Sequence, residues 1–122
     1  MFDHVGLNVR NYEQSKSFYA AALAPLGYGI TFDNAEWHAA AFGPEGKYGF
    51  WVAEREPYGT GTHVAFTTDD RAAVDAFYAA AIAAGGTDNG PPGIREHYHP
   101  TYYAAFVHDP DGNNVEVVCH RG

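Results

Sequence analysis

Cysteine, basic residues and long apolar runs are all scarce in this chain of 122 residues. Its single cysteine, Cys119, excludes an internal disulfide. Seven Lys and Arg residues against fifteen Asp and Glu give a formal net charge of −8, which argues against a nucleic-acid partner because phosphate binding needs clustered cations. No apolar run approaches the roughly 18 residues that a membrane helix needs. We therefore expect small molecules as partners, with no nucleic acid and no membrane.

Several other signals are also missing. The opening residues MFDHVGLNV contain no basic leader followed by a long apolar stretch, so we expect a cytoplasmic protein. The sequence has neither a glycine-rich phosphate loop nor a nucleophile elbow. Hydrophobic residues make up 46% of the chain and aromatic residues 16%, which is too apolar for a disordered chain. The length suits one domain with a substantial core.

The chain contains an internal repeat. When it is shifted by 59 residues, HV at 4–5 falls on HV at 63–64, and FYAAALA at 18–24 falls on FYAAAIA at 77–83 without a gap. Alanine-rich helices can resemble each other through composition alone. Composition does not explain a matched His-Val pair fourteen residues upstream, so we interpret the repeat as a duplication.

Each unit changes from strand periodicity to helix periodicity. HVGLNV alternates, so that its valines and leucine share one face and His4 lies on the other. Asn11 and Asp70, both good helix N-caps, precede the helical patterns. Alternating segments follow each helix, with GPEG and DPDG as matching hairpin turns. We predict a strand, a helix and further strands in each unit.

The second unit is longer than the first. Its DPDG turn lies 66 residues after GPEG, so the offset has grown by seven. The stretch 88–100, DNGPPGIREHYHP, has two prolines with glycines around them, which predicts an inserted loop. This loop contains His97 and His99, and two adjacent tyrosines follow it closely.

Strand alternation directs three polar side chains away from the predicted helices. His4 and His63 occupy matching positions of the repeat, and Glu116 falls on the inner face of the last strand. A carboxylate in an apolar strand is costly unless it is paired or bound to a cation, and two nearby histidines would complete a metal site. The alternatives are histidines satisfied by backbone groups, and a buried pair of Glu116 with one histidine.

The pattern DHVGLNV…SFYAAALAPLGY…HVAF…DAFYAA…FVHDPDGNNVEVV resembles the vicinal oxygen chelate superfamily of glyoxalase I, fosfomycin-resistance proteins, bleomycin-binding proteins and extradiol dioxygenases. The resemblance covers nearly the whole chain, and DPDGNNVE is its most specific element. It implies an α+β fold of two βαβββ modules, whose curved mixed sheets form a metal-binding cup. We place module 1 at about 1–57 and module 2 at about 58–122 of a single domain.

The resemblance also implies the cofactor and the assembly. The cofactor would be a divalent metal ion, Fe, Mn, Zn or Ni, held by His4, His63 and Glu116. The assembly would be a homodimer, in which the modules pair either within one chain or between chains. Phe50 falls opposite Glu116 at the offset of 66, where glyoxalase I-like enzymes carry a fourth ligand, so four-ligand glyoxalase I activity is not expected.

Two functions follow from the resemblance. The first is a metal-dependent small-molecule enzyme, a glyoxalase-like lyase, a dioxygenase or a resistance transferase, whose metal chelates vicinal oxygens of the substrate. The alternative is a bleomycin-type resistance protein that binds a small molecule in an aromatic cup without turnover.

Residues outside the metal set are candidates for contact with the substrate. His99 and Tyr102 are candidate catalytic residues, because imidazole and phenol groups donate or exchange protons. The candidate substrate-binding residues are Tyr48, Phe50, His97, Tyr103 and His120. We expect HYHPTYY at 97–103 to be a lid and wall of the pocket, the alternative being an exposed loop rich in aromatic residues. Trp37 and Trp51 are expected mostly in the core.

Overall fold

The computed structural model describes residues 2–122, which form two successive βαβββ units. The first unit consists of β1 (Val5–Val9), α1 (Tyr12–Leu23), the 3-10 turn η1 (Ala24–Leu26), β2 (Gly29–Asn34), β3 (Ala39–Gly43) and β4 (Phe50–Glu54). The second consists of β5 (His63–Thr67), α2 (Arg71–Ala83), β6 (Thr87–Ile94), β7 (Tyr103–His108) and β8 (Asn114–Cys119). The predicted order of strand, helix and further strands is confirmed in both units.

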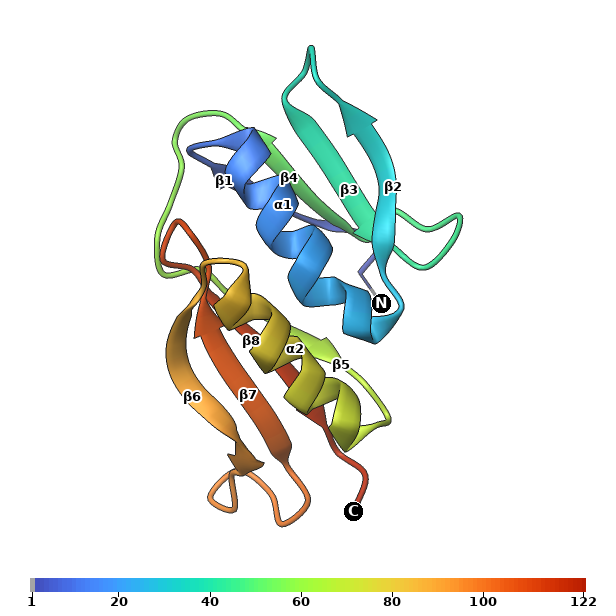
Figure 1. Ribbon diagram of the computed structural model, residues 1–122, viewed down its shortest axis with the longest axis vertical. Coiled ribbons are helices and arrows are strands. Elements are labelled where there is room, and N and C mark those ends of the chain that lie inside the picture. The colour runs from blue at the N-terminus through green and yellow to red at the C-terminus, as the bar shows by residue number, and fades with distance from the viewer. Residues whose placement is uncertain (1) are drawn as a thin grey trace.

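Each unit forms its own four-stranded mixed sheet. The strand orders are β1-β4-β3-β2 and β5-β8-β7-β6, so the two sheets have the same topology. In both, the first and last strands of the unit are parallel neighbours and the other pairs are antiparallel. Figure 1 shows one sheet above the other, with α1 and α2 in front of them. The sheets are curved but not closed, which confirms the predicted α+β class.

Both helices begin at the predicted caps. The side chains of Asn11 and Asp70 each accept a backbone N–H from the first turn of the helix that follows. The helices pack on each other and on one face of the sheets, and one apolar core runs through both units. At its centre the rings of Phe50 and Phe66, one from each sheet, have centroids 5.3 Å apart. The two modules therefore share a single core.

Neither helix is long. α1 has 12 residues and α2 has 13, about three and a half turns each. In the part of the chain that the structure describes, no helix combines the length and the apolar character needed to span a membrane.

The DPDG turn ties the second module to the first. Its buried Asp109 accepts the backbone N–H groups of Asp111 and Asn113, and the hydroxyl of Tyr19 on α1 donates to the same carboxylate. The carboxylate of Asp111 lies 3.7 Å from Nε of Arg10. The most specific motif of the sequence thus fixes where β8 begins and how α1 packs beside it.

The predicted insertion at 88–100 is corrected by the structure. Most of this stretch belongs to β6, and the connection that follows spans 95–102. Pro91 and Pro92 fit in β6 because it lies at the sheet edge, where outward-facing N–H groups need no partner. The pairing of β6 with β7 shifts register twice. The extra length of module 2 therefore lies in two places. The edge strand β6 has eight residues where β2 has six, and the connection that follows β6 is longer.

Candidate metal and ligand site

The parallel strands β5 and β8 bring His63 and Glu116 together. Nε2 of His63 lies 3.1 Å from Oε1 of Glu116. Glu116 is only 2% exposed, whereas about half of the His63 side chain is exposed. Val115 and Val117, on either side of Glu116, lie in the core on the helix side. The structure therefore contains the predicted pair of Glu116 with one histidine, on the face that strand alternation predicts, with Glu116 buried and His63 half-exposed.

The hydrogen bonding of His63 determines which nitrogen faces the carboxylate. Nδ1 of His63 lies 3.0 Å from the backbone carbonyl oxygen of Asn114. Because a carbonyl oxygen can only accept, Nδ1 carries a proton and donates it. In the neutral ring, Nε2 then presents its lone pair to Glu116, and two acceptors facing each other repel. A proton between the two atoms, or a cation bound by both, would satisfy this arrangement.

Tyr102 holds the other oxygen of the same carboxylate. Its hydroxyl donates a hydrogen bond to Oε2 of Glu116. Burial, with the hydrogen bond to Glu116 as a further cause, raises the pKa of Tyr102 above its ordinary value, so the phenol remains a donor at neutral pH. The ring of Tyr102 packs edge-on against His120, with centroids 5.2 Å apart. Tyr102 therefore orients Glu116 and leaves Oε1 to face His63.

The connection 95–102 reaches this pair at its last residue, Tyr102. The rings of His99 and His120 have centroids 6.3 Å apart. His97 lines a small cavity of about 300 Å³ together with Phe106, and Phe106 in turn stacks on His63 with centroids 6.4 Å apart. These contacts connect His99 to the pair through His120 and Tyr102, and His97 through Phe106. The action of the two histidines on a ligand remains a prediction.

His4 directly precedes β1 of the other sheet and does not reach this pair. Its Nδ1 is 2.7 Å from a carboxylate oxygen of Asp3. Among residues 2–122, no three His, Cys, Asp or Glu side chains come close enough to hold a metal ion within one chain. The predicted meeting of His4 with His63 and Glu116 at one point is therefore not found within a single chain.

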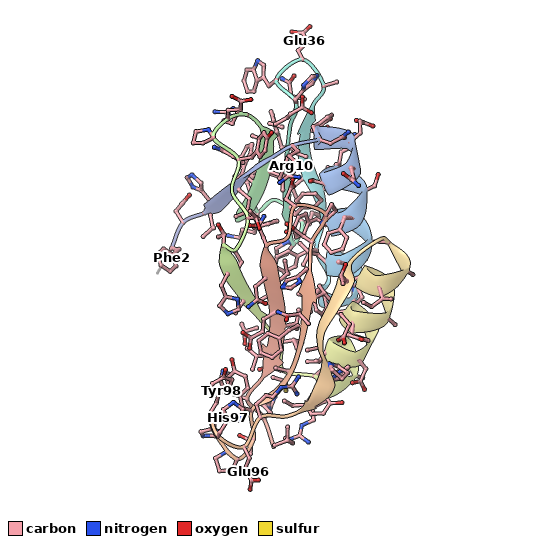
Figure 2. All side chains as sticks on the ribbon, turned by 90° about the vertical axis from the view of Figure 1, so that its left-hand side faces the viewer. Phe2, Arg10, Glu36, Glu96, His97 and Tyr98 are labelled. Atoms are coloured by element: carbon pink, nitrogen blue, oxygen red, sulfur yellow. The ribbon has the colours of Figure 1, made fainter. Side chains whose placement is uncertain are left out.

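The placement of the two modules explains the separation. Figure 2 shows Glu36, in the connection between β2 and β3, and His97, in the connection between β6 and β7, at opposite ends of the molecule. Both helices lie on one side of the sheets in this view, and Phe2 projects from the other side. The two modules thus lie side by side, and their helix-free faces do not close onto each other.

A groove on the first sheet contains His4. It has a volume of about 490 Å³, and Trp37, Trp51 and Arg55 also line it. The expectation that the two tryptophans lie mostly in the core is wrong, because Trp37 is 64% exposed and Trp51 is partly exposed. The missed signal was strand alternation, since Trp51 lies between two core residues of β4 and must face the other side.

Phe50 faces the core, and the expectation that it lines the cup is corrected. Phe50 pairs with Val5 of β1. In the second sheet the repeat counterpart of Val5 pairs with Val115, so Phe50 corresponds to Val115 rather than to Glu116. Phe50 is 2% exposed, and its ring lies 4.9 Å from that of Tyr19. The turn before β4 is one residue longer than the DPDG turn, and a slip of one residue reverses the face. Trp51 therefore occupies the position that matches Glu116.

Two tyrosines predicted to contact substrate point elsewhere. The hydroxyl of Tyr103 donates to Asp75 of α2 at 2.6 Å, and Arg71 lies over its ring, so Tyr103 is on the helix side of the sheet. Tyr48 lies in the turn before β4, where its side chain lines a separate cavity beside β2. Its backbone carbonyl accepts the indole N–H of Trp51 at 2.7 Å. Tyr48 thus orients a groove residue through its backbone.

Comparison with known families decides the classification. The model of the Glyoxalase/Bleomycin resistance protein/Dioxygenase superfamily matches residues 1–117. The chain belongs to this superfamily. Members of the superfamily bind small molecules and generally use divalent metals. A comparison with curated proteins found no match.

Solved structures agree with this classification. A glyoxalase/bleomycin resistance protein from Albidiferax ferrireducens T118 is 33% identical over 98% of both chains, with a TM-score of 0.82. A glyoxalase/bleomycin resistance protein/dioxygenase family enzyme from Burkholderia phytofirmans PsJN is 21% identical over 96% of both chains, with a TM-score of 0.70. A glyoxalase-related enzyme from Fulvimarina pelagi is 18% identical over 98% of this chain and 87% of that chain, with a TM-score of 0.73. The last two likenesses show the shared fold alone.

Proposed function

We propose that this protein is a metal-dependent small-molecule enzyme with a site of two histidines and one carboxylate. His63 and Glu116 of one chain supply two ligands, and the partner subunit's His4 supplies the third. The observation that carries the proposal is the 3.1 Å separation of His63 Nε2 and Glu116 Oε1, with Nδ1 of His63 bound to a carbonyl. Adjacent ligand atoms around a cation with bonds of about 2.0–2.2 Å lie about 2.8–3.1 Å apart in octahedral and about 3.3–3.6 Å apart in tetrahedral coordination. Metal-binding histidines typically donate the N–H of the ring nitrogen that does not bind the metal to an acceptor such as a backbone carbonyl.

A homodimer accounts for the position of His4. His4 and His63 occupy matching positions of the repeat, and Nδ1 of His4 is also bound, by Asp3, so that its Nε2 remains available as a ligand. Most oligomers of identical chains have twofold symmetry. A twofold pairing that sets the first sheet of each subunit against the second sheet of the other would build two such sites. The side-by-side placement of the modules supports this arrangement.

The donor set suits Fe, Mn, Zn or Ni, because these ions accept both imidazole nitrogen and carboxylate oxygen. A divalent cation at this site would polarise vicinal oxygens of a substrate and stabilise developing negative charge. Tyr102 keeps Glu116 oriented by its hydrogen bond. His99 is the candidate for proton exchange, since an imidazole ring can both donate and accept a proton. Trp51 stands where a fourth protein ligand would be, which argues against glyoxalase I activity.

The alternative function is sequestration of a small molecule without turnover. The observation that favours it is the groove with two exposed or partly exposed tryptophans, which needs no metal to bind an aromatic ligand. A metal-free protein that retains an aromatic ligand through purification would support this function over the enzyme.

Metal analysis of the purified protein separates the two functions. We expect about one divalent ion per chain in protein prepared without chelators, and its loss in Glu116→Ala and His63→Ala. Glu96→Ala is the matched control, because Glu96 is an exposed carboxylate in the loop, and it should keep the metal. Circular dichroism would verify that each variant folds. Metal content unchanged in Glu116→Ala would show that the assigned ligand is wrong.

A further inference from the structure

Three aromatic rings form a row on the first sheet, on the face away from the helices. The ring of Phe32 lies 6.0 Å from that of Trp37 and 5.2 Å from that of Trp51, measured between centroids. The indole N–H of Trp51 is held by a backbone carbonyl, which fixes the plane of the ring. Large aromatic side chains left exposed as a group mark binding surfaces more often than single exposed ones do. The row is therefore a candidate stacking platform for a planar ligand.

The charge of the groove is opposite to that of the whole chain. The protein has 15 acidic and 7 basic residues, yet no Asp or Glu within residues 2–122 lines this groove. Arg55 lies at the end of β4 and lines the groove, together with the amide side chain of Asn8 and the imidazole of His4. A guanidinium offers a planar fork of donors that matches a carboxylate. The groove therefore favours an anionic group beside the aromatic row.

The floor of the groove is open. Gly6 lies on it without a side chain, and a Cβ added there would come into ordinary contact with Cβ of Trp51, at 3.7 Å. The volume of about 490 Å³ falls within the range of about 300–1,000 Å³ that small-molecule sites occupy. The space suits a ligand of one or two rings.

We propose that this groove binds an aromatic carboxylate, whose ring stacks on Trp37 and Trp51 and whose carboxylate pairs with Arg55. This proposal names a substrate class for the enzyme of the proposed function. It depends on that function for turnover of the ligand but not for binding. In the homodimer His4 would belong to both the groove and the metal site, with the cation at the end of β1 and β4 opposite to Arg55, because Val5 pairs with the first residue of β4 and Val9 with the last. Binding of the aromatic acid itself requires only the first sheet.

The test uses the full chain after treatment with EDTA, so that its result does not depend on the metal. The chain has only two tryptophans, and both line this groove, so tryptophan fluorescence reports on the groove alone. The probes are benzoate, benzamide, benzylamine and cyclohexanecarboxylate. We expect saturable binding of benzoate, about tenfold weaker binding of benzamide, and still weaker binding of the cationic and non-aromatic probes. Equal affinity for benzoate and benzamide would overturn the proposal, as would no saturation by benzoate at millimolar concentrations.

Variants then assign the effect to residues. Arg55→Gln should weaken benzoate binding about tenfold and leave benzamide binding within about twofold, because only the charged pair is lost. Lys47→Gln is the matched control, since Lys47 is an exposed cation that does not line the groove. Trp37→Leu, at an exposed position that tolerates change, should weaken both aromatic probes. Benzoate affinity unchanged in Arg55→Gln would overturn the proposal even if the protein proves to hold its metal.

Discussion

Replacing Tyr19 with phenylalanine should destabilise the protein by about 2 kcal/mol. Tyr19 is fully buried on α1, and its hydroxyl donates to the buried carboxylate of Asp109 in the DPDG turn. The ring would stay in place, so only the hydroxyl is lost. A hydrogen bond to a charged group contributes about 1.5–3 kcal/mol. We take the lower half of that range because Asp109 still accepts hydrogen bonds from the backbone N–H groups of Asp111 and Asn113, at 2.9 and 2.8 Å.

Urea unfolding followed by circular dichroism near neutral pH measures this loss. The matched control is Tyr78→Phe, whose hydroxyl donates to Asp88 at 3.0 Å in an exposed setting, and which should cost less than about 0.5 kcal/mol. At about 4 °C per kcal/mol for a chain of this size, Tyr19→Phe should lower Tm by about 8 °C. Equal small losses in the two variants would refute the assigned role of the DPDG turn.

The same variant makes a prediction for alkaline pH. Burial, and the nearby Asp109 carboxylate, raise the pKa of Tyr19 well above its ordinary value of 10.0. The folded protein therefore holds this proton more tightly than the unfolded chain. The resulting stability is complete below about pH 10 and is lost as the pH rises toward the folded pKa. The stability gap between wild type and Tyr19→Phe should narrow above that pH, and a widening gap would contradict the assignment.

Three further predictions concern the site and its scaffold. Tyr102→Phe should keep one metal per chain at saturation but weaken metal affinity about tenfold, measured by competition with a chelator, because the ligand carboxylate loses its orienting donor; unchanged affinity would count against that role. Replacing His97 and His99 together with alanine should leave metal content intact and weaken ligand binding, and loss of metal would show that these histidines are ligands. Gly86→Ala should destabilise the fold by about 1–3 kcal/mol in thermal unfolding, because its Cβ would lie 2.9 Å from a carbonyl oxygen of α2. Gly29→Ala, with open space around it, is the control.

The fold could be predicted where the determining signals are local. Asn11 and Asp70 mark helix starts through side-chain hydrogen bonds that depend on a few neighbouring residues. Strand alternation likewise placed Glu116 opposite the core. It failed for Phe50, because the repeat offset was measured between turns whose lengths differ by one residue, and a single residue reverses the face of a strand. The number of residues in a turn is defined only once the pairing of its two flanking strands is known.

The meeting of two of the three candidate ligands could be predicted in the same way. Alternation on two parallel neighbours, β5 and β8, is enough to bring His63 beside Glu116. It states which face His4 occupies, but not where the first module lies relative to the second. That placement depends on the shared core around Phe50 and Phe66, which no local pattern encodes. For this reason the separation of His4 from the other two candidate ligands emerged only from the structure.

Mixing variant chains tests most directly whether the metal site is shared between subunits. His4→Ala and Glu116→Ala homodimers should each lack metal. After the two are unfolded and refolded together, about half of the dimers should be mixed, each with one intact site of two, which restores about a quarter of the wild-type metal content. Mixing His63→Ala with Glu116→Ala should restore none, because both of those ligands come from one chain. A His4→Ala and Glu116→Ala mixture that stays metal-free, while the wild type binds metal, would contradict a site shared between two subunits.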